Sequence, residues 1–162
     1  MAEHLIPIRS TLDLETADRI CAQAIALRRS HGLLPLAVAV LDAGGNLVCF
    51  RREDGCGVLR ANIAIGKAWG ALGMGMSTRQ IRDRLANRPT FQSALAAASD
   101  GRFIPTPGGV LIIDAAGQAI GSVGISGDAS DKDEFCAIEA IKACGHVAEP
   151  PEPQANWNEA GL

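Results

Sequence analysis

Apolar residues recur every three or four positions over long stretches of the chain, which is the period of an amphipathic α-helix. The first stretch ends near Ser30, and Ser10 and Asp13 have the spacing of a capping box at its start. The last stretch opens with the same spacing at Ser130 and Asp133. The last stretch is expected to be helical up to Cys144. Three further helices are expected: one over residues 57–74, a short one that begins at a cap at Thr78, and one that runs from a cap at Thr90 to Ala98.

Within the 57–74 helix, large apolar residues and small or basic residues fall on opposite faces. We expect the first set to pack on the core: Val58, Ile65, Trp69 and Leu72. The other face carries Arg60, Ala64, Lys67 and Ala71. Its two cations are two turns apart, roughly 10 Å along the axis, so this face could line an anion-binding pocket.

Two short apolar runs, each followed by a turn and a second run, indicate β-hairpins. The first pair is residues 36–41 and 47–50, and the second is residues 110–113 and 119–126. The turns are near-copies, which indicates either the same turn chemistry used twice or a duplication. Helices that alternate with hairpins predict an α+β fold, an α/β sandwich with a mainly antiparallel sheet flanked by helices.

Composition excludes several classes of function. The net charge of −3 and the pI near 5.6 argue against a nucleic-acid partner. No apolar run is long enough to span a bilayer and no leader is apparent, so we expect no membrane partner. Five cysteines without a CxxC motif favour the reducing cytoplasm. No metal site is expected, because His4, His31 and His146 lack partners at ligand spacing.

Basic residues gather between the first hairpin and the 57–74 helix. Arg52, Cys56, Arg60 and Lys67 are candidates for ligand binding, since arginine pairs with carboxylates and a desolvated lysine can act as a nucleophile. The alternative is an ordinary solvated helix face with surface cations. Cys56, at a helix start beside Arg52, could have a lowered pKa, and the alternative is a buried, inert thiol.

The loop over residues 105–109 ends in two glycines. Thr106, Gly108 and Gly109 are candidate ligand contacts, because adjacent glycines allow close approach and free N–H groups that can hold an anion or a haem propionate. The alternative is a turn that leads into a strand. The glycine-rich residues 121–127 lack the spacing of a nucleotide loop. Asp133 is either a helix cap or a catalytic carboxylate, and Glu134 is a weaker candidate.

These motifs, in this order, resemble the GlcG/HbpS family, which includes the C-terminal domain of PduO-type cobalamin adenosyltransferases. The similarity covers roughly residues 10–147. The motifs that carry it are residues 39–48, Arg52 with Asp54 and Gly55, residues 63–68, Gly108 with Gly109, residues 121–127, and Asp133 with Glu134. The resemblance implies about five antiparallel strands flanked by helices, assembly into dimers or larger rings, and haem as a cofactor. It also implies a place among genes for organic-acid catabolism.

Two functions follow as hypotheses. The chain is a binding protein for haem, another tetrapyrrole or a small anionic metabolite, or it is an enzyme of organic-acid or aromatic-acid catabolism. In the enzyme, Arg52 and Arg60 would hold a carboxylate. Lys67 would act as an acid/base or Schiff-base lysine, with Asp133 or Glu134 as a second proton carrier.

The same patterns predict how the chain is organised. We expect one domain over residues 1–148, a proline-rich tail over residues 149–162, and a homo-oligomer from dimer to octamer in which the tail with Trp157 crosses a neighbour. Lys67 is expected to be at least partly buried and to face Arg52 or Arg60 across a cavity.

Overall fold

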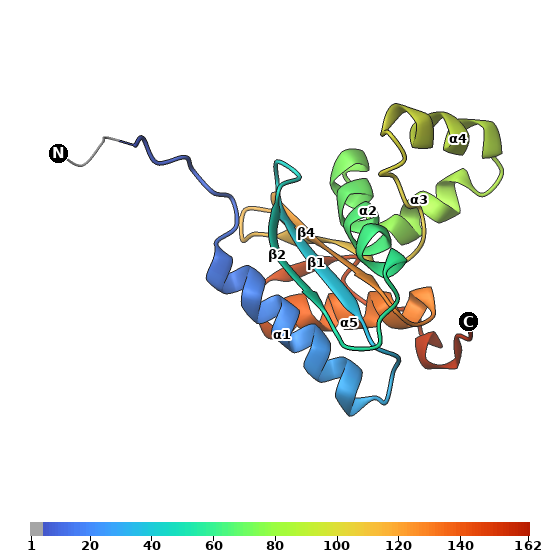
Figure 1. The fold of residues 1–162 in the computed structure, drawn as a ribbon. Coiled ribbons are helices and arrows are strands. Elements are labelled where there is room, and N and C mark those ends of the chain that lie inside the picture. The colour runs from blue at the N-terminus through green and yellow to red at the C-terminus, as the bar shows by residue number, and fades with distance from the viewer. Residues whose placement is uncertain (1–4) are drawn as a thin grey trace.

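A five-stranded antiparallel sheet forms the centre of the computed structural model, which describes residues 5–162. The strands lie in the order β2-β1-β4-β3-β5, so each predicted hairpin is formed and the two hairpins pair through β1 and β4. The α+β class expected from the sequence is confirmed (Figure 1). The strands are β1 (Ala37–Asp42), β2 (Leu47–Arg52), β3 (Gly109–Ile113), β4 (Ala119–Ser126) and β5 (Val147–Glu149).

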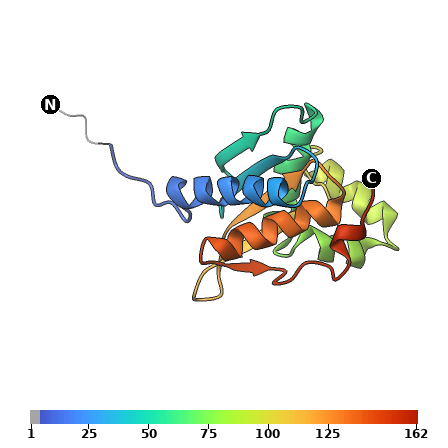
Figure 2. The ribbon, with the colours of Figure 1, turned by 90° about the horizontal axis from the view of Figure 1, so that it is seen from below.

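Helices cover both faces of the sheet (Figures 1 and 2). On one face α1 and α5 lie side by side and form the main core with side chains such as Val38, Val123 and Ile125. On the other face α2 packs against β1, β3 and β4, and α3 and α4 extend beyond it. The helices are α1 (Leu14–Ser30), α2 (Leu59–Met74), α3 (Thr78–Leu85), α4 (Pro89–Ala98) and α5 (Ser130–Ala143).

The two hairpin turns are built in the same way. In the first, the Asp42 carboxylate accepts hydrogen bonds from the amides of Gly44 and Asn46. In the second, Asp114 accepts from the amides of Ala116 and Gln118. The near-identical turn sequences are therefore explained by the same aspartate-centred turn chemistry.

The helix starts differ from the predicted ones. Asp13 caps α1 through a 2.7 Å bond from the Thr16 amide, because its carboxylate is one turn closer to the helix than Ser10. Predicted caps at Ser10, Thr78, Thr90 and Ser130 are wrong, and the residues in those positions are Asp13, Ser77, Arg88 and Ala129.

The predicted orientation of α2 is reversed. Its small residues face the sheet, whereas Val58, just before the helix, is 81% exposed. The reason is the short distance between the backbone of α2 and the backbone of the sheet. A Cβ at Gly124 would overlap the carbonyl oxygen of Ala64, and one at Gly109 would overlap that of Lys67. Only a stripe of small residues lets two backbones come so close, so the large apolar residues are left on the outer face.

The C-terminal segment packs on its own chain. Strand β5, which was not predicted as a strand, pairs with β3 at the sheet edge. Beyond it, a short 3-10 helix (Trp157–Glu159) lies against α5, where Trp157 stacks on Phe135 with ring centroids 3.6 Å apart. In this structure Trp157 therefore covers Phe135 of its own chain, whereas we expected it to cross a neighbour.

Candidate functional site

The close packing of α2 on the sheet buries Lys67 under the Gly108 loop. The ammonium donates to the Ile125 carbonyl oxygen at 2.9 Å and to the Asp133 carboxylate at 3.0 Å. Only 2% of the Lys67 side chain and 1% of the Asp133 side chain is exposed. Gly108 has φ +117°, and a Cβ there would lie 3.0 Å from the ammonium nitrogen. The Lys67 ammonium is thus enclosed by the Ile125 carbonyl, the Asp133 carboxylate and Gly108.

Asp133 supplies the anion that Lys67 needs. Its second carboxylate oxygen accepts a 3.0 Å bond from the Asp128 amide. Burial raises the pKa of Asp133 to about 6, and the Lys67 ammonium opposes that rise. The carboxyl is therefore mainly ionised at pH 7. The expected burial of Lys67 is confirmed, but its ammonium pairs with a carboxylate, where we expected Arg52 or Arg60 across a cavity.

Arg60 lies two turns before Lys67 and has a different environment. It is half-buried, and its Nη1 donates to the Ser126 hydroxyl at 3.3 Å. Among residues 5–162, no carboxylate lies within ion-pair distance of its guanidinium. A half-buried cation without a protein counter-ion is a ready site for an anionic ligand.

Arg52 and Cys56 lie in the same neighbourhood. Cys56 is buried, and burial raises the pKa of its thiol even though Arg60 and Arg52 both act to lower it. The lowered pKa considered for Cys56 is therefore wrong, and the thiol is the favoured form. Arg52 is exposed at the end of β2, and within the described chain it too has no ion-pair partner. We call Arg52, Cys56, Arg60 and Ser126 the arginine site.

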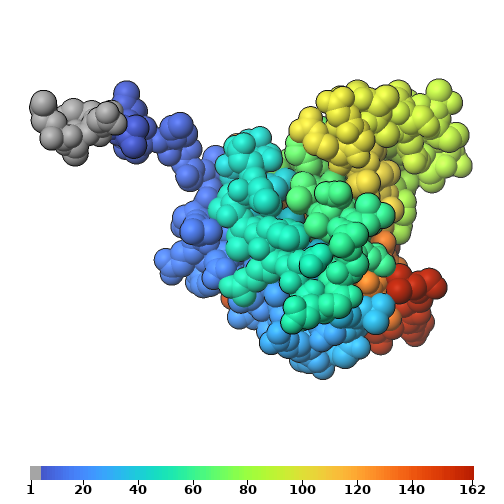
Figure 3. Space-filling view, viewed as in Figure 1, coloured from blue at the N-terminus to red at the C-terminus, as the bar shows by residue number. Residues whose placement is uncertain are grey.

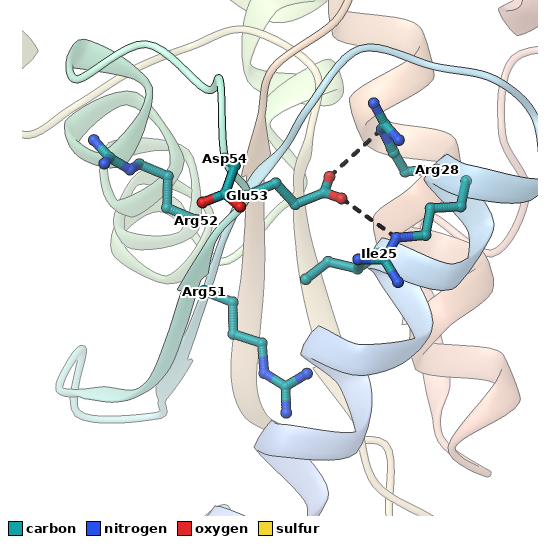
Figure 4. Close-up of a pocket in the computed structure, with 7 residues that line it drawn as sticks. Ile25, Arg28, Arg51, Arg52, Glu53 and Asp54 are labelled. Carbon is teal, nitrogen blue, oxygen red and sulfur yellow. Dashed lines mark ion pairs between the residues drawn. The ribbon is translucent and has the colours of Figure 1, made fainter.

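A groove of about 510 Å³ lies between α1 and the end of β2, and Arg52 and Asp54 belong to its lining (Figure 4). Glu53 sits between Arg28 and Arg29, at 3.5 and 3.7 Å, and accepts a bond from the Leu36 amide. Arg51 also lines the groove, and it pairs with Asp18, which does not. Figure 4 shows Arg52 extending away from Glu53 and from Arg51, as alternation along a strand requires. Glu53 therefore pairs with two arginines of α1, and Arg51 has its own carboxylate partner in Asp18.

Glu134 is a second buried carboxylate, and it has weaker partners. Its side chain is 0% exposed, Arg79 of α3 lies 3.4 Å away, and neither carboxylate oxygen accepts a hydrogen bond from the described residues. Burial raises the pKa of Glu134 to about 7, with Arg79 opposing. Like Asp133, it lies away from solvent.

The other predicted ligand contacts are not grouped at an opening. Thr106 is exposed, whereas Gly108 and Gly109 are buried. The Gly109 amide is not free for an anion, because it donates to the Thr78 hydroxyl at 2.8 Å. The two glycines serve the close packing of α2 and Lys67 against the sheet.

No cluster of potential metal ligands occurs among residues 5–162, and His4 lies outside them. Sequence reasoning missed three further contributors: Ser126, which holds Arg60; Arg79, which faces Glu134; and Glu53, which occupies the groove. Each of them contacts a residue that is 17 or more positions away in the chain, so no local motif marks them.

The profile of the protein family described as "Haem degrading protein HbpS-like" matches residues 12–142. The chain belongs to the HbpS-like family. A curated relative, the "Uncharacterized 15.0 kDa protein in dhaT-dhaS intergenic region" of Citrobacter freundii, is 28% identical over 132 residues, which are 82% of this chain and 91% of the relative. The resemblance seen in the sequence motifs is thereby confirmed.

Solved structures agree with the HbpS-like assignment. The crystal structure of HbpS is 26% identical, has a TM-score of 0.72, and the match covers 90% of this chain and 98% of HbpS. The structure titled "Crystal Structure of PduOC:Heme Complex" has a TM-score of 0.75 at 24% identity, over 83% of this chain and 96% of that one. At that identity the second likeness shows a shared fold. None of the helices described here is both long and apolar enough to cross a membrane.

Proposed function

We propose that this HbpS-like chain is a small-ligand-binding protein that holds a carboxylate of its ligand between Arg52 and Arg60. The observation that carries the proposal is the half-buried guanidinium of Arg60, which has Ser126 as a hydrogen-bond partner and no carboxylate of its own within the described chain. An arginine left unpaired beside a buried ion pair gains most from a ligand that brings the missing negative charge.

Haem or a related tetrapyrrole is the first candidate ligand, and a small anionic metabolite is the second. Support for haem comes from the family description and from the PduOC complex that contains it. The propionates of haem would supply the negative charge that Arg52 and Arg60 lack. The site does not fit the iron: Cys56 favours its thiol form, and His31 packs against Phe135 and Trp157. The proposal therefore concerns the acid groups of the ligand and assigns no chemistry to iron.

The enzyme hypothesis has less support from the geometry. It requires Lys67 and Asp133, or Glu134, to reach a substrate. Lys67 and Asp133 are instead bonded to each other and closed off by the Gly108 loop, and Glu134 is fully buried against Arg79. A substrate would have to displace this packing, so we assign these residues to the folded scaffold.

The cellular setting is part of the proposal. The charge, the reduced cysteines and the family resemblance support a cytoplasmic homo-oligomer, from dimer to octamer, encoded among catabolic genes.

A ligand series tests the binding function. Hemin, protoporphyrin IX, its dimethyl ester and a short aliphatic dicarboxylate are titrated into the full-length protein, followed by absorbance, tryptophan fluorescence and calorimetry. We expect the free-acid porphyrins to bind and the ester to bind at least ~30-fold more weakly, because a desolvated charged hydrogen bond is worth about 2–5 kcal/mol.

The outcomes separate the two parts of the proposal. Binding of the dicarboxylate but of no porphyrin would reject haem and keep the anion site. Equal affinity for the free acid and the ester would reject the role of the arginines. If no compound bound, the binding function itself would be rejected.

A further inference from the structure

The segment before α1 carries unusually exposed apolar side chains. Leu5, Ile6 and Ile8 are 88%, 88% and 92% exposed. We call residues 5–10 the N-terminal arm. Both ribbon views show it leaving the body next to α1 as an extended strand of chain (Figures 1 and 2). Full burial of one such side chain is worth about 1.5–3 kcal/mol, so an arm of three has a strong tendency to find an apolar partner.

A matching hollow lies at the far end of α2. It is bounded by α2, by α4 and by the segment that follows α4, and its volume is about 140 Å³. Apart from Ser99, its lining is apolar or glycine: Trp69, Gly73, Met74, Leu95, Ala98 and Phe103. An apolar cavity of about 150 Å³ holds a benzene molecule, so this hollow is large enough for an aliphatic side chain.

The surroundings of the hollow also lack a cover. Helix α4 has no buried residue although seven of its ten residues are apolar, proline included. The hollow therefore adjoins a mostly apolar helix surface that is open to solvent.

The direction of the arm determines whose hollow it can fill. In Figures 1 and 2 the arm runs away from α4, and in the space-filling view the arm and the α3–α4 lobe project on opposite sides of the body (Figure 3). The arm of one copy therefore points outward, where the hollow of another copy can receive it. Pro7 lacks an N–H and interrupts a regular strand ladder, which favours insertion of single side chains over sheet extension.

We infer that the N-terminal arm of one copy docks in the hollow between α2 and α4 of a second copy. Leu5, Ile6 and Ile8 supply the apolar contacts, and the arm thereby links subunits in the self-association proposed above. The inference is independent of the ligand, since the hollow does not include the arginine site. It also replaces the tail as the element that crosses between subunits, because Trp157 is occupied by its own chain.

The first test measures association of the full-length chain by sedimentation velocity and light scattering across a micromolar concentration series. The triple variant Leu5→Ser/Ile6→Ser/Ile8→Ser removes the apolar arm. We expect the dissociation constant of the arm-mediated contact to rise by about tenfold for each side chain that is buried there. Leu162→Ser is the matched control, because it removes an 80% exposed leucine at the other terminus, and its association should equal that of the unaltered chain.

A second variant blocks the receiving side. Gly73→Leu should fill the hollow without harm to α2, because a Cβ at this position makes only ordinary contact, 3.7 Å from the Trp69 ring. We expect it to weaken association as much as the arm variant does, with a melting temperature at least equal to that of the unaltered chain. Unchanged association in both variants would overturn the docking of the arm while leaving self-association intact. A monomeric unaltered chain would overturn both.

A cross-linking experiment locates the contact directly. A photo-reactive phenylalanine analogue replaces Ile6, and isotopically light and heavy chains are mixed before irradiation. Docking predicts mixed-isotope cross-links to peptides that contain Trp69, Met74 or Leu95. Cross-links confined to a single chain, or to other surfaces of the second copy, would contradict the inference.

Discussion

Lys67 and Arg60 are two turns apart on one helix, yet only one of their two positive charges has a counter-ion among the described residues. Lys67 is enclosed and paired with Asp133, whereas Arg60 is half-buried and lacks a carboxylate among the described residues. Both cations lay on the face of α2 that sequence reasoning assigned to an anionic ligand. A buried cation therefore indicates a ligand only where the protein itself has not supplied the counter-ion.

The same distinction separates the arginines at the end of β2. Arg51 pairs with Asp18 of α1, whereas Arg52 has no ion-pair partner among the described residues. The groove between α1 and β2 therefore has ion pairs of its own at Glu53, and Arg52 of the candidate ligand site also borders it.

The largest effect is expected from Asp133→Ala. This change leaves the Lys67 ammonium buried without a counter-ion, which costs about 3–5 kcal/mol of unfolding free energy. Urea denaturation measures it. The double variant Lys67→Met/Asp133→Leu should lose much less stability, because it removes both charges. A stable Asp133→Ala protein would show that the pair does not hold α2 to α5.

Gly108→Ala should cost about 2–3 kcal/mol. Its φ of +117° disfavours any side chain, and the new Cβ would meet the Ile125 carbonyl oxygen at 2.9 Å as well as the Lys67 ammonium. Gly32→Ala is the control, since φ is +64° there but no atom lies within 4 Å. Thermal unfolding of both variants should show the larger loss at Gly108, and equal losses would contradict its role as a cover over Lys67.

Glu134→Gln should stabilise the protein above neutral pH by about 2 kcal/mol. The pKa of Glu134 rises from 4.5 to about 7 on folding, because burial outweighs Arg79. The folded chain therefore binds this proton more tightly, and the stability that Glu134 contributes falls as the pH rises from 4.5 through 7. Denaturation at pH 5 and pH 8 checks the sign: the variant's advantage should be present at pH 8 and nearly absent at pH 5.

Arg60→Ala should change stability least, by about 0.5 kcal/mol, since it removes one 3.3 Å hydrogen bond to Ser126 and no ion pair. Arg84→Ala, at an exposed position of α3, is the control for loss of one positive charge. A loss of several kcal/mol in Arg60→Ala would place Arg60 with Lys67 in the scaffold and remove the contrast on which the proposed function rests.

Local patterns predicted the features that depend on neighbouring residues. The hairpins follow from the Asp42 and Asp114 turns, and the approximate extents of the helices follow from their period. The orientation of α2 was wrong because size normally marks the core face. Here, however, glycines on β3 and β4 select a stripe of small residues instead.

The candidate site was predictable in part. Arg52, Cys56 and Arg60 were named from their spacing, and the structure brings them into one neighbourhood. The pairing of Lys67 with Asp133 joins residues 66 positions apart, so neither residue type nor spacing could show that the lysine already has its anion. The short strand β5 and its pairing with β3 were missed for the same reason.

The most direct test of the central claim compares protoporphyrin IX binding by Arg52→Ala/Arg60→Ala with binding by Arg84→Ala and by the unaltered chain, all at the same ionic strength and with melting temperatures recorded. We expect the double arginine variant to bind at least ~30-fold more weakly with a nearly unchanged melting temperature, and Arg84→Ala to bind as the unaltered chain does. Undiminished binding by the folded double variant would contradict the assignment of the ligand's carboxylate to Arg52 and Arg60.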